Sequence, residues 1–368
     1  MRSSSIALAA SLLLGLSCML PLSGNIQSPL VPAAPVAPVV PVVPVASDVP
    51  LSPADTLTLT FAGDLLLDRG VRRVIEKSPH SQPLPPEGRR ERGLSDSFHV
   101  LDSLFSSSID SLFRTSQVVV ANLECPATKI KAPVYKRFIF RAEPEWLPAL
   151  RHHGITHLNL ANNHAIDQGR QGLMDTRHNI IAAGMTPVGA GSNMQEAVQP
   201  VLLAECSRRV WLLSSVRLML ENFAYLDDRP CVSQEPMDSL IQRVRRLRRS
   251  DPRAVIIVSL HWGGEHTLKP VPAQRLDAHR LIDAGADALI CHHTHTQQTI
   301  ETYRGRPIYY SIGNFIFDQQ QPVNSRACLV QLKVTADSVA AVTIPIVIQR
   351  CKPDQLRNRL GCSFPTTD

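Results

Sequence analysis

The stretch "LICHHTHTQQT" (residues 289–299) places three histidines within four positions at the end of an apolar run. The whole chain has 13 histidines in 368 residues, so this cluster is a local feature. A short apolar run that follows a helical pattern is typical of a buried strand in an α/β sheet. The sequence therefore predicts a strand over 287–292 whose carboxyl end carries His292, His293 and His295.

Other apolar runs alternate with helical patterns along the chain. This alternation predicts an α/β layered domain over residues 55–350, followed by a C-terminal tail over 351–368. The segment 78–97 is rich in proline and charge, which is typical of a surface insertion. Further strands are expected at 57–63, 118–124, 157–162 and 254–261, helices at 143–154, 169–184 and 272–286, and antiparallel strands joined by turns at 299–317 and 327–348.

The first 24 residues differ from this pattern. Arg2 and a polar run precede an apolar stretch over 6–22, and small residues follow, which is typical of a secretory signal peptide over 1–24. Cleavage near Ser23, retention as a membrane anchor and lipid attachment at Cys18 remain open. We expect export to the periplasm or the cell surface, with a membrane tether through the N-terminus in the second and third cases.

Residues 25–54 form a proline-rich segment. Proline recurs at every third position from 29 to 44. This period matches the turn of a polyproline II helix, which stays extended without internal hydrogen bonds. We interpret the segment as a stiff spacer, and a ligand for an SH3-type domain is the alternative.

The composition is that of a globular chain, with 44% hydrophobic residues and a formal net charge of +6. Much of the positive excess lies in an arginine-rich stretch over 241–253. We expect a helix there, either with a solvated face or in contact with an acidic polymer or a membrane surface. A nucleic-acid partner is not expected.

The chain has eight cysteines, which suggest disulfides in an exported protein. Sequence proximity favours the pairing of Cys351 with Cys362, and next the pairing of Cys206 with Cys231. Spacing alone fixes neither pairing.

Each predicted strand ends at a polar side chain that can bind a metal ion. Binding sites in α/β sheets form outside the carboxyl ends of the strands, so these groups are expected to meet at one edge. Carboxylate, carboxamide and imidazole groups together suit divalent ions such as Mn, Fe or Zn. The strand-end residues are Asp64, Glu124, Asn163, His164, His261, His293 and His295.

Each of these residues also has a structural interpretation when taken alone. Asp64 can cap a following helix, and a single histidine such as His261 can be a hydrogen-bonded core residue. His293 and His295 are two positions apart and would face the same side of an extended backbone. We expect a metal site because all five strand ends carry such groups.

Seven blocks of the sequence resemble, in the same order, the CapA family of capsule and poly-γ-glutamate synthesis proteins. That family belongs to the calcineurin-like metallophosphatase superfamily, so the resemblance implies a four-layer α/β/β/α sandwich of the metallophosphatase type. The resemblance runs from Leu57 to Asp318. The blocks are "FAGDLLL", "VVVANLECP", "LNLANNHAIDQGRQGLMDT", "VGAGSN", "VSLHWGGEHT", "LIDAGADALICHHTHTQQTIE" and "YYSIGNFIFD".

The resemblance also implies roles for single residues. Glu124 takes the position of a carboxylate that bridges two ions, and His164 that of an acid toward a leaving group, with metal ligation as its alternative role. The implied metal ligands are Asp64, Glu124, Asn163, His261, His293 and His295.

The sequence departs from the superfamily pattern at several of these blocks. Leu66 stands where a ligating histidine is typical, and Glu124 stands where aspartate is usual, so the number of metal ions is open. Cys291 and Thr294 replace the usual glycine and proline. Cys291 is a candidate extra ligand, a disulfide partner for Cys125, or a small buried thiol.

Other residues in the blocks have two interpretations each. Lys136 and Arg137 either meet an anionic group of a substrate or are exposed charges. Glu265 either orients a ligating histidine from outside the ligand set or faces solvent. Asn314 is expected to fix a turn.

The resemblance implies an exported protein of capsule or poly-γ-glutamate-type polymer synthesis. One hypothesis is a metal-dependent hydrolase that acts on a phosphoester or on an amide of an anionic polymer. The alternative is a non-catalytic assembly or export factor that binds the polymer within the cell-envelope synthesis machinery and retains the metal-site geometry. A lectin-like module would need exposed aromatic residues, and these make up only 5% of the chain.

Overall fold

The computed structural model describes residues 56–78, 98–218, 226–319 and 321–356. The predicted signal peptide (1–24), the predicted spacer (25–54) and residues 79–97 of the predicted insertion lie outside these ranges. Within the described residues, every helix is too short or too polar to cross a membrane.

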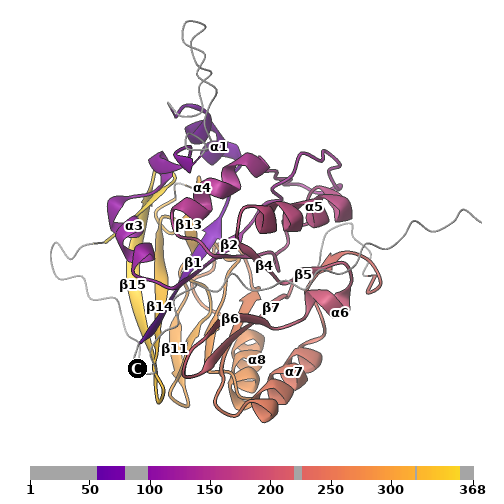
Figure 1. The fold of residues 1–368 in the computed structure, drawn as a ribbon, viewed down its shortest axis with the longest axis vertical. Coiled ribbons are helices and arrows are strands. Elements are labelled where there is room, and N and C mark those ends of the chain that lie inside the picture. The colour runs from indigo at the N-terminus through magenta and orange to yellow at the C-terminus, as the bar shows by residue number, and fades with distance from the viewer. Residues whose placement is uncertain (1–55, 79–97, 219–225, 320, 357–368) are drawn as a thin grey trace, which may run out of the picture. The chain divides into compact units, whose positions relative to one another are not determined.

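The described residues form two stacked β-sheets with helices on both outer faces (Figure 1). The first sheet contains, in spatial order, β16 (Lys352–Gln355), β15 (Val339–Gln349), β14 (Arg326–Val334), β1 (Leu57–Leu65), β2 (Val118–Leu123), β3 (His157–Asn159) and β4 (Thr186–Val188), with β13 (Asn314–Ile316) paired to β1. The second sheet contains β11 (Ile300–Tyr303), β12 (Arg306–Tyr309), β10 (Ala288–Ile290), β9 (Val255–His261), β7 (Arg209–Val216) and β6 (Val201–Glu205). A separate pair joins β5 (Ala190–Gly191) to β8 (Cys231–Val232).

Each sheet has its own helices. The helices against the first sheet are α1 (Arg69–Glu76), α3 (Ser107–Arg114), α4 (Leu147–His152) and α5 (Gly169–Ala182). The helices against the second sheet are α7 (Met237–Ser250) and α8 (Pro272–Asp283). The short elements are α6 (Met194–Ala197) and the 3-10 turns η2 (Asp102–Leu104) and η3 (Pro144–Trp146).

Three hydrophobic cores separate the four layers. Phe61 of β1 and Ile257 of β9 lie in the core between the sheets. Ala121 of β2 lies in the core under the first set of helices, and Val258 of β9 lies in the core under the second set. Side chains alternate along a strand, so a strand that is covered on both faces is apolar at nearly every position. This explains the continuous apolar runs, and the predicted four-layer α/β/β/α sandwich is confirmed.

The parallel strands place their carboxyl ends at one edge of the two sheets. β1, β2 and β3 run parallel in the first sheet, and β9 and β10 run parallel in the second. All five strands predicted before residue 297 are present. The edge at which they end is where the polar groups were expected to meet.

The segment 299–317 is only partly the predicted antiparallel pair. β11 and β12 are antiparallel, but β13 leaves the second sheet and pairs in parallel with β1 in the first. Gly313 supplies the turn between them with a φ of 79°. An apolar pattern does not reveal which sheet a three-residue strand joins, so the prediction is wrong for β13. The first sheet also extends past residue 350, because β16 pairs with β15.

β1 passes very close to the segment that precedes β13. A Cβ atom on Gly63 would lie 2.0 Å from the carbonyl oxygen of Gly313. The amide of Asp64 donates a hydrogen bond of 3.1 Å to the same oxygen. Only glycine fits at position 63, and this close approach fixes the position of Asp64 near the end of β1.

The predicted helix in the arginine-rich stretch is confirmed as α7. Arg243 forms an ion pair with Glu235, and Arg248 forms one with Asp287. The exposed arginines of the helix are Arg245, Arg246 and Arg249. Part of the positive charge therefore stabilises the domain, and contact with a polymer or membrane stays a hypothesis.

All six cysteines in the described residues are free thiols. Cys206 packs against the core between the sheets, whereas Cys231 lies in a separate small cluster, so their suggested pairing is wrong. Cys125 and Cys291 lie on the outer faces of different sheets, which separates them by both layers of strands, and that pairing is also wrong. The partner suggested for Cys351 lies outside the described residues.

Candidate metal centre

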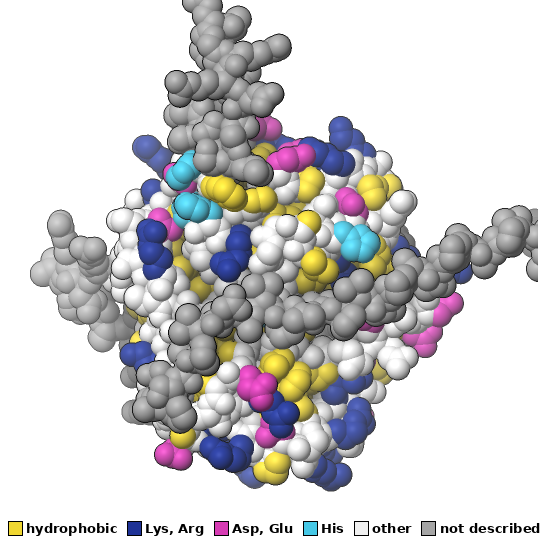
Figure 2. Space-filling view, in the orientation of Figure 1, with side chains coloured by type: hydrophobic (Ala, Val, Ile, Leu, Met, Phe, Trp, Pro, Cys, Tyr) yellow, Lys and Arg dark blue, Asp and Glu magenta, His cyan; other side chains and the backbone are white. Residues whose placement is uncertain are grey.

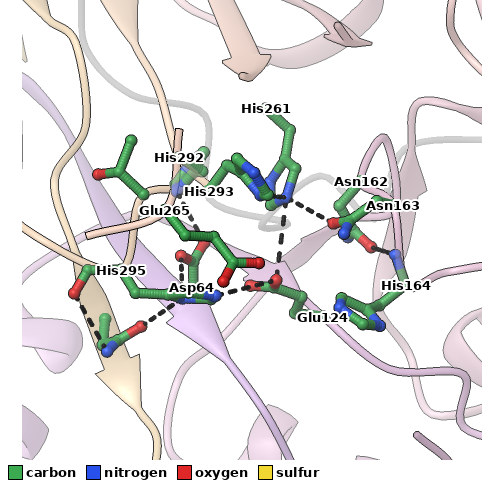
Figure 3. A network of polar contacts seen from close by, with 12 residues as sticks. Asp64, Glu124, Asn162, Asn163, His164, His261, Glu265, His292, His293 and His295 are labelled. Atoms are coloured by element: carbon green, nitrogen blue, oxygen red, sulfur yellow. Dashed lines mark hydrogen bonds and ion pairs between the residues drawn. The ribbon is translucent and has the colours of Figure 1, made fainter. Parts of the chain in front are cut away.

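Polar residues that end the strands of both sheets meet at one edge (Figure 3). Asp64 lies in β1, Glu124 directly follows β2, and His261 ends β9. His293 and His295 lie in the loop after β10. The structure therefore brings together groups that are far apart in the sequence.

Glu124, His261 and His293 form a first group of potential ligands, with donor atoms within 4.8 Å of one another. His261 Nε2 lies 3.8 Å from Glu124 Oε1 and 3.1 Å from His293 Nδ1. Asn163, in the loop after β3, places its Oδ1 atom 2.9 Å from His261 Nε2. The first group thus combines imidazole, carboxylate and carboxamide donors.

Asp64, Glu124 and His295 form a second group with the same spacing. His295 Nδ1 lies 3.2 Å from Asp64 Oδ2, and His295 Nε2 lies 3.7 Å from Glu124 Oε1. His292, which was not among the predicted ligands, places Nδ1 3.5 Å from Asp64 Oδ1. Glu124 belongs to both groups and so stands where a bridging carboxylate was implied.

Three of the four carboxylate oxygens at the centre lack a hydrogen-bond donor. Asp64 is fully buried and Glu124 is 1% exposed. Asp64 Oδ2 and both carboxylate oxygens of Glu124 accept no hydrogen bond from the protein. Buried anionic oxygens without a partner carry a large free-energy cost. A cation would offset this cost, and the mixed nitrogen and oxygen donors fit a divalent ion such as Mn, Fe or Zn.

Burial and neighbouring charges shift the pKa values of these groups in opposite directions. Burial raises the pKa of Glu124 well above its ordinary value, and the charge of Asp64 adds to this. Burial lowers the pKa of His261 well below its ordinary value and lowers that of His293 to about 3. Although burial also lowers it, the pKa of His295 rises to about 9 because Glu124 and Asp64 stabilise its charged form. Opposed shifts in a small buried cluster are typical of functional sites.

Asn122 in β2 holds Asp64, and it was not among the predicted site residues. Its side-chain amide donates a 2.8 Å hydrogen bond to Asp64 Oδ1 and lies 3.3 Å from His261 Nδ1. Its carbonyl oxygen accepts hydrogen bonds from the side chains of Asn159 and Asn162. The only signal in the sequence is that a polar residue interrupts the apolar run of β2.

His293 and His295 do not lie in extended backbone. Their φ values are 98° and 56°, in the left-handed region that non-glycine residues rarely adopt. The prediction of an extended segment is wrong because β10 ends at Ile290 and the following loop turns the rings into the site. Asn314, which was predicted to fix a turn, places Oδ1 2.9 Å from His295 Nδ1. It therefore orients a candidate ligand.

His164 lies on the Glu124 side of the site in Figure 3. Its Nδ1 atom lies 2.8 Å from Asp167 Oδ2. Because a carboxylate only accepts hydrogen bonds, Nδ1 carries the ring proton. Burial lowers the pKa of His164, although Asp167 opposes this, so the ring is neutral near pH 7. Asp167 was not singled out in the sequence, because a carboxylate three residues after a histidine is common.

Lys136 has a buried side chain, so the interpretation as an exposed charge is wrong. Its side chain is 6% exposed, and Nζ donates to Asp167 Oδ1 at 2.9 Å and to the backbone oxygen of Asn163 at 3.0 Å. The structure thus places Lys136 behind His164. Arg137 is exposed, with its guanidinium 5.0 Å from the ring centre of Phe138.

Glu265 and Cys291, which had several possible roles in the sequence, occupy different surroundings. Glu265 lies over the two ligand groups in Figure 3 and forms its ion pair with His266, at 3.8 Å. Cys291 lies in the core between the second sheet and its helices, where burial raises its pKa to about 12. Cys291 therefore fits the interpretation as a small buried thiol.

Comparisons with known proteins show which family the chain resembles. A family model described as "Bacterial capsule synthesis protein PGA_cap" matches residues 58–319. "Capsule biosynthesis protein CapA" of Bacillus anthracis is 28% identical over 316 residues, which cover 83% of this chain and 71% of that protein. "PGA biosynthesis protein CapA" of Bacillus subtilis (strain 168) is 29% identical over 303 residues, which cover 81% and 73%. Among solved structures, a 5'-nucleotidase precursor from Thermus thermophilus is 12% identical with a TM-score of 0.42, over 80% of this chain and 54% of that one.

Proposed function

The chain belongs to the family of bacterial capsule synthesis proteins described as PGA_cap, and we propose that it serves capsule or poly-γ-glutamate-type polymer synthesis as a metal-dependent hydrolase. The proposal rests on one observation. Two groups of buried ligands share Glu124, and carboxylate oxygens in both groups have no hydrogen-bond partner in the protein. The substrate would be a phosphoester, or an amide, of an anionic polymer.

Two divalent ions of the Mn, Fe or Zn class would be held by the two groups. Such ions supply Lewis acidity toward a phosphoryl or carbonyl oxygen and lower the pKa of a water molecule. Their proposed ligands are Asp64, Glu124, Asn163, His261, His293 and His295.

His164 is the proposed acid toward the leaving group. The Nδ1 proton faces Asp167, so Nε2 is free of a proton in the resting protein. An anionic substrate favours a second proton on the ring, because nearby negative charge raises the pKa of an imidazole. The imidazolium then donates from Nε2, while Asp167 and Lys136 hold the ring in place.

A non-catalytic factor that binds the polymer and retains the metal site is the second candidate. The burial of Lys136 favours it, because a cation that was expected to bind substrate is engaged inside the protein. Arg137 is left as the exposed cation of the predicted pair.

The N-terminal sequence supports a location outside the cytoplasm, in the periplasm or at the cell surface. The three forms are a chain cleaved near Ser23, an uncleaved anchor and a lipoprotein modified at Cys18. Mass spectrometry of the mature N-terminus from the cell envelope distinguishes them. Recovery of an unmodified full-length chain from the cytoplasm would remove the basis for export.

The test of function combines metal analysis with an activity screen. Elemental analysis of the purified chain measures bound metal, and a screen in added Mn²⁺ measures hydrolysis of phosphodiesters and γ-glutamyl amides. We expect Glu124→Gln to lose the metal of this centre and turnover together. Bound metal without turnover of either bond would favour the polymer-binding factor. Absence of bound metal in the wild type would overturn both candidates.

A further inference from the structure

A second cluster of titratable side chains lies among the helices that cover the first sheet. In Figure 2, histidine side chains lie beside acidic ones at the upper left, over the region where Figure 1 labels α3 and α4. Chain segments around η2, α3 and the end of α4 contribute to it. A cavity of about 250 Å³ there is lined by His99, Asp102, Asp110, Arg114, His152 and His153.

His153 is held rigidly at this cavity. Its ring stacks on Phe105 with centroids 3.9 Å apart, and the residue is 8% exposed. Its Nδ1 atom lies 2.8 Å from Asp110 Oδ1. Because the carboxylate accepts, Nδ1 donates and the ring presents Nε2 to the cavity. A carboxylate that fixes the far nitrogen in this way is the usual support of a metal-binding imidazole.

The Nε2 atom of His153 meets a second carboxylate without bonding to it. It lies 3.2 Å from Asp102 Oδ1, yet it has no hydrogen-bond partner. A hydrogen bond needs the donor to point at the acceptor. Two ligand atoms of one metal ion do not point at each other, because both point at the ion that lies between them. At metal–ligand distances of about 2.0–2.2 Å and a tetrahedral angle, two such ligands lie roughly 3.3 Å apart.

We propose that His153 Nε2 and Asp102 bind a divalent ion of the zinc class, separate from the centre at the strand ends. The other oxygen of Asp102, Oδ2, lies 3.0 Å from His99 Nδ1. The ring of His152 lies 5.2 Å from that of His99 and 5.6 Å from that of His153, between centroids. His99 or His152 completes the ligand set.

The role of this ion is structural. Asp102 belongs to η2, whereas His153 directly follows α4, so one ion ties two separate segments of the helix layer together. Arg114 also lines this cavity, and it approaches Asp110 at 4.0 Å. A bound ion should therefore stabilise the folded chain without taking part in hydrolysis.

The test uses the chain with Glu124→Gln, because this change removes the carboxylate that both groups of the other centre share. Equilibrium dialysis against Zn²⁺ alone, followed by elemental analysis, measures the remaining site. We expect one equivalent of Zn²⁺ in this background and a rise in the unfolding midpoint on adding it. A second change, Asp102→Asn, should weaken Zn²⁺ binding at least about tenfold and abolish the rise.

Control variants at exposed residues distinguish the loss of a metal ligand from a general effect of removing a charge or a histidine. Asp337→Asn removes an exposed carboxylate elsewhere and should leave Zn²⁺ binding unchanged. His153→Gln should act like Asp102→Asn, and His178→Gln is its exposed control. If His153→Gln fails to fold, the half-exposed Asp102 still carries the test. Equal Zn²⁺ affinity for Asp102→Asn and Asp337→Asn, or no Zn²⁺ bound in the Glu124→Gln background, would overturn the proposal.

Discussion

His164 and Asp167 form a buried pair in which the ring Nδ1 atom donates a 2.8 Å hydrogen bond to the Oδ2 atom of the carboxylate. The other oxygen of Asp167 accepts from Lys136. The imidazole is therefore held from behind by a carboxylate that is itself held by a cation. This arrangement fixes which ring nitrogen is available to a substrate.

The pair predicts a selective effect of Asp167→Asn on the proposed hydrolysis. The ring loses its fixed orientation and the partner that stabilises its charged form, so proton donation to the leaving group suffers. We expect turnover of substrates with poor leaving groups to fall about 100-fold, with much less effect on nitrophenyl esters. Bound metal should not change. A uniform loss across leaving groups, measured against Asp337→Asn, would speak against proton donation by His164.

The two ligand groups predict different metal losses for single ligands. His293 belongs to the first group, and we expect His293→Ala to lose about half of the metal bound at the strand-end centre while keeping the fold. A chelator should lower the unfolding midpoint of the wild type more than that of the variant, because an ion stabilises only a form that binds it. At an ion concentration 100-fold above the dissociation constant this contribution is about 2.7 kcal/mol. Equal wild-type midpoints with and without chelator, beside a destabilised variant, would make His293 a structural residue.

The close approach at Gly63 predicts a linked loss of stability and metal. In Gly63→Ala, the new Cβ atom overlaps the carbonyl oxygen of Gly313, so β1 must move and carry Asp64 with it. We expect a destabilisation of about 1–3 kcal/mol in urea unfolding, together with weaker metal binding. Gly264→Ala is the control, because its Cβ atom would only reach ordinary contact with Thr267. Unchanged metal binding in Gly63→Ala would show that Asp64 is placed by other contacts.

Buried His157 predicts a dependence of stability on pH. Burial lowers its pKa from 6.5 to about 4 in the folded protein. As the pH falls, His157 of the unfolded chain therefore binds a proton before His157 of the folded chain does. The contribution of His157 to the free energy of unfolding is complete above the pKa of the unfolded chain, and it is lost as the pH falls toward the pKa of the folded chain. The loss is on the order of 3 kcal/mol between about pH 7 and about pH 4. His157→Asn should remove this part of the pH dependence of urea unfolding. Parallel pH curves for the two proteins would contradict the assignment.

The ligands at the strand ends could be predicted because their positions in the sequence follow two general rules. Asp64 and Glu124 follow apolar runs, and carboxyl ends of parallel strands share an edge. The supporting residues obey neither rule. Asn122 lies inside a strand. Lys136 lies in a loop, and its side chain is buried because it donates a hydrogen bond to Asp167, a residue 31 positions later. Their roles depend on tertiary contacts that no local pattern encodes.

The sequence predicted that His293 and His295 lie at the site, but it did not predict the backbone conformation that places them there. The cluster after β10 indicated ligands, yet the spacing of His293 and His295 suggested strand alternation. The left-handed backbone of both residues replaces that alternation with a turn. The path of β13 was missed for a similar reason, because its pairing with β1 joins segments from opposite ends of the domain.

The pairing of Thr58 in β1 with Lys333 in β14 affects the order of events in folding. Bringing segments so distant in sequence together requires closing a very long loop, and such non-local contacts form slowly. Asp64 lies near the end of the same strand, while the imidazoles come from β9 and the loop after β10. A partly synthesised chain that stops before β9 has the carboxylates but none of those imidazoles. An ion at the strand-end centre would thus bind only after β9 and the loop after β10 have been made, so its binding would report a late stage of folding and could not nucleate it.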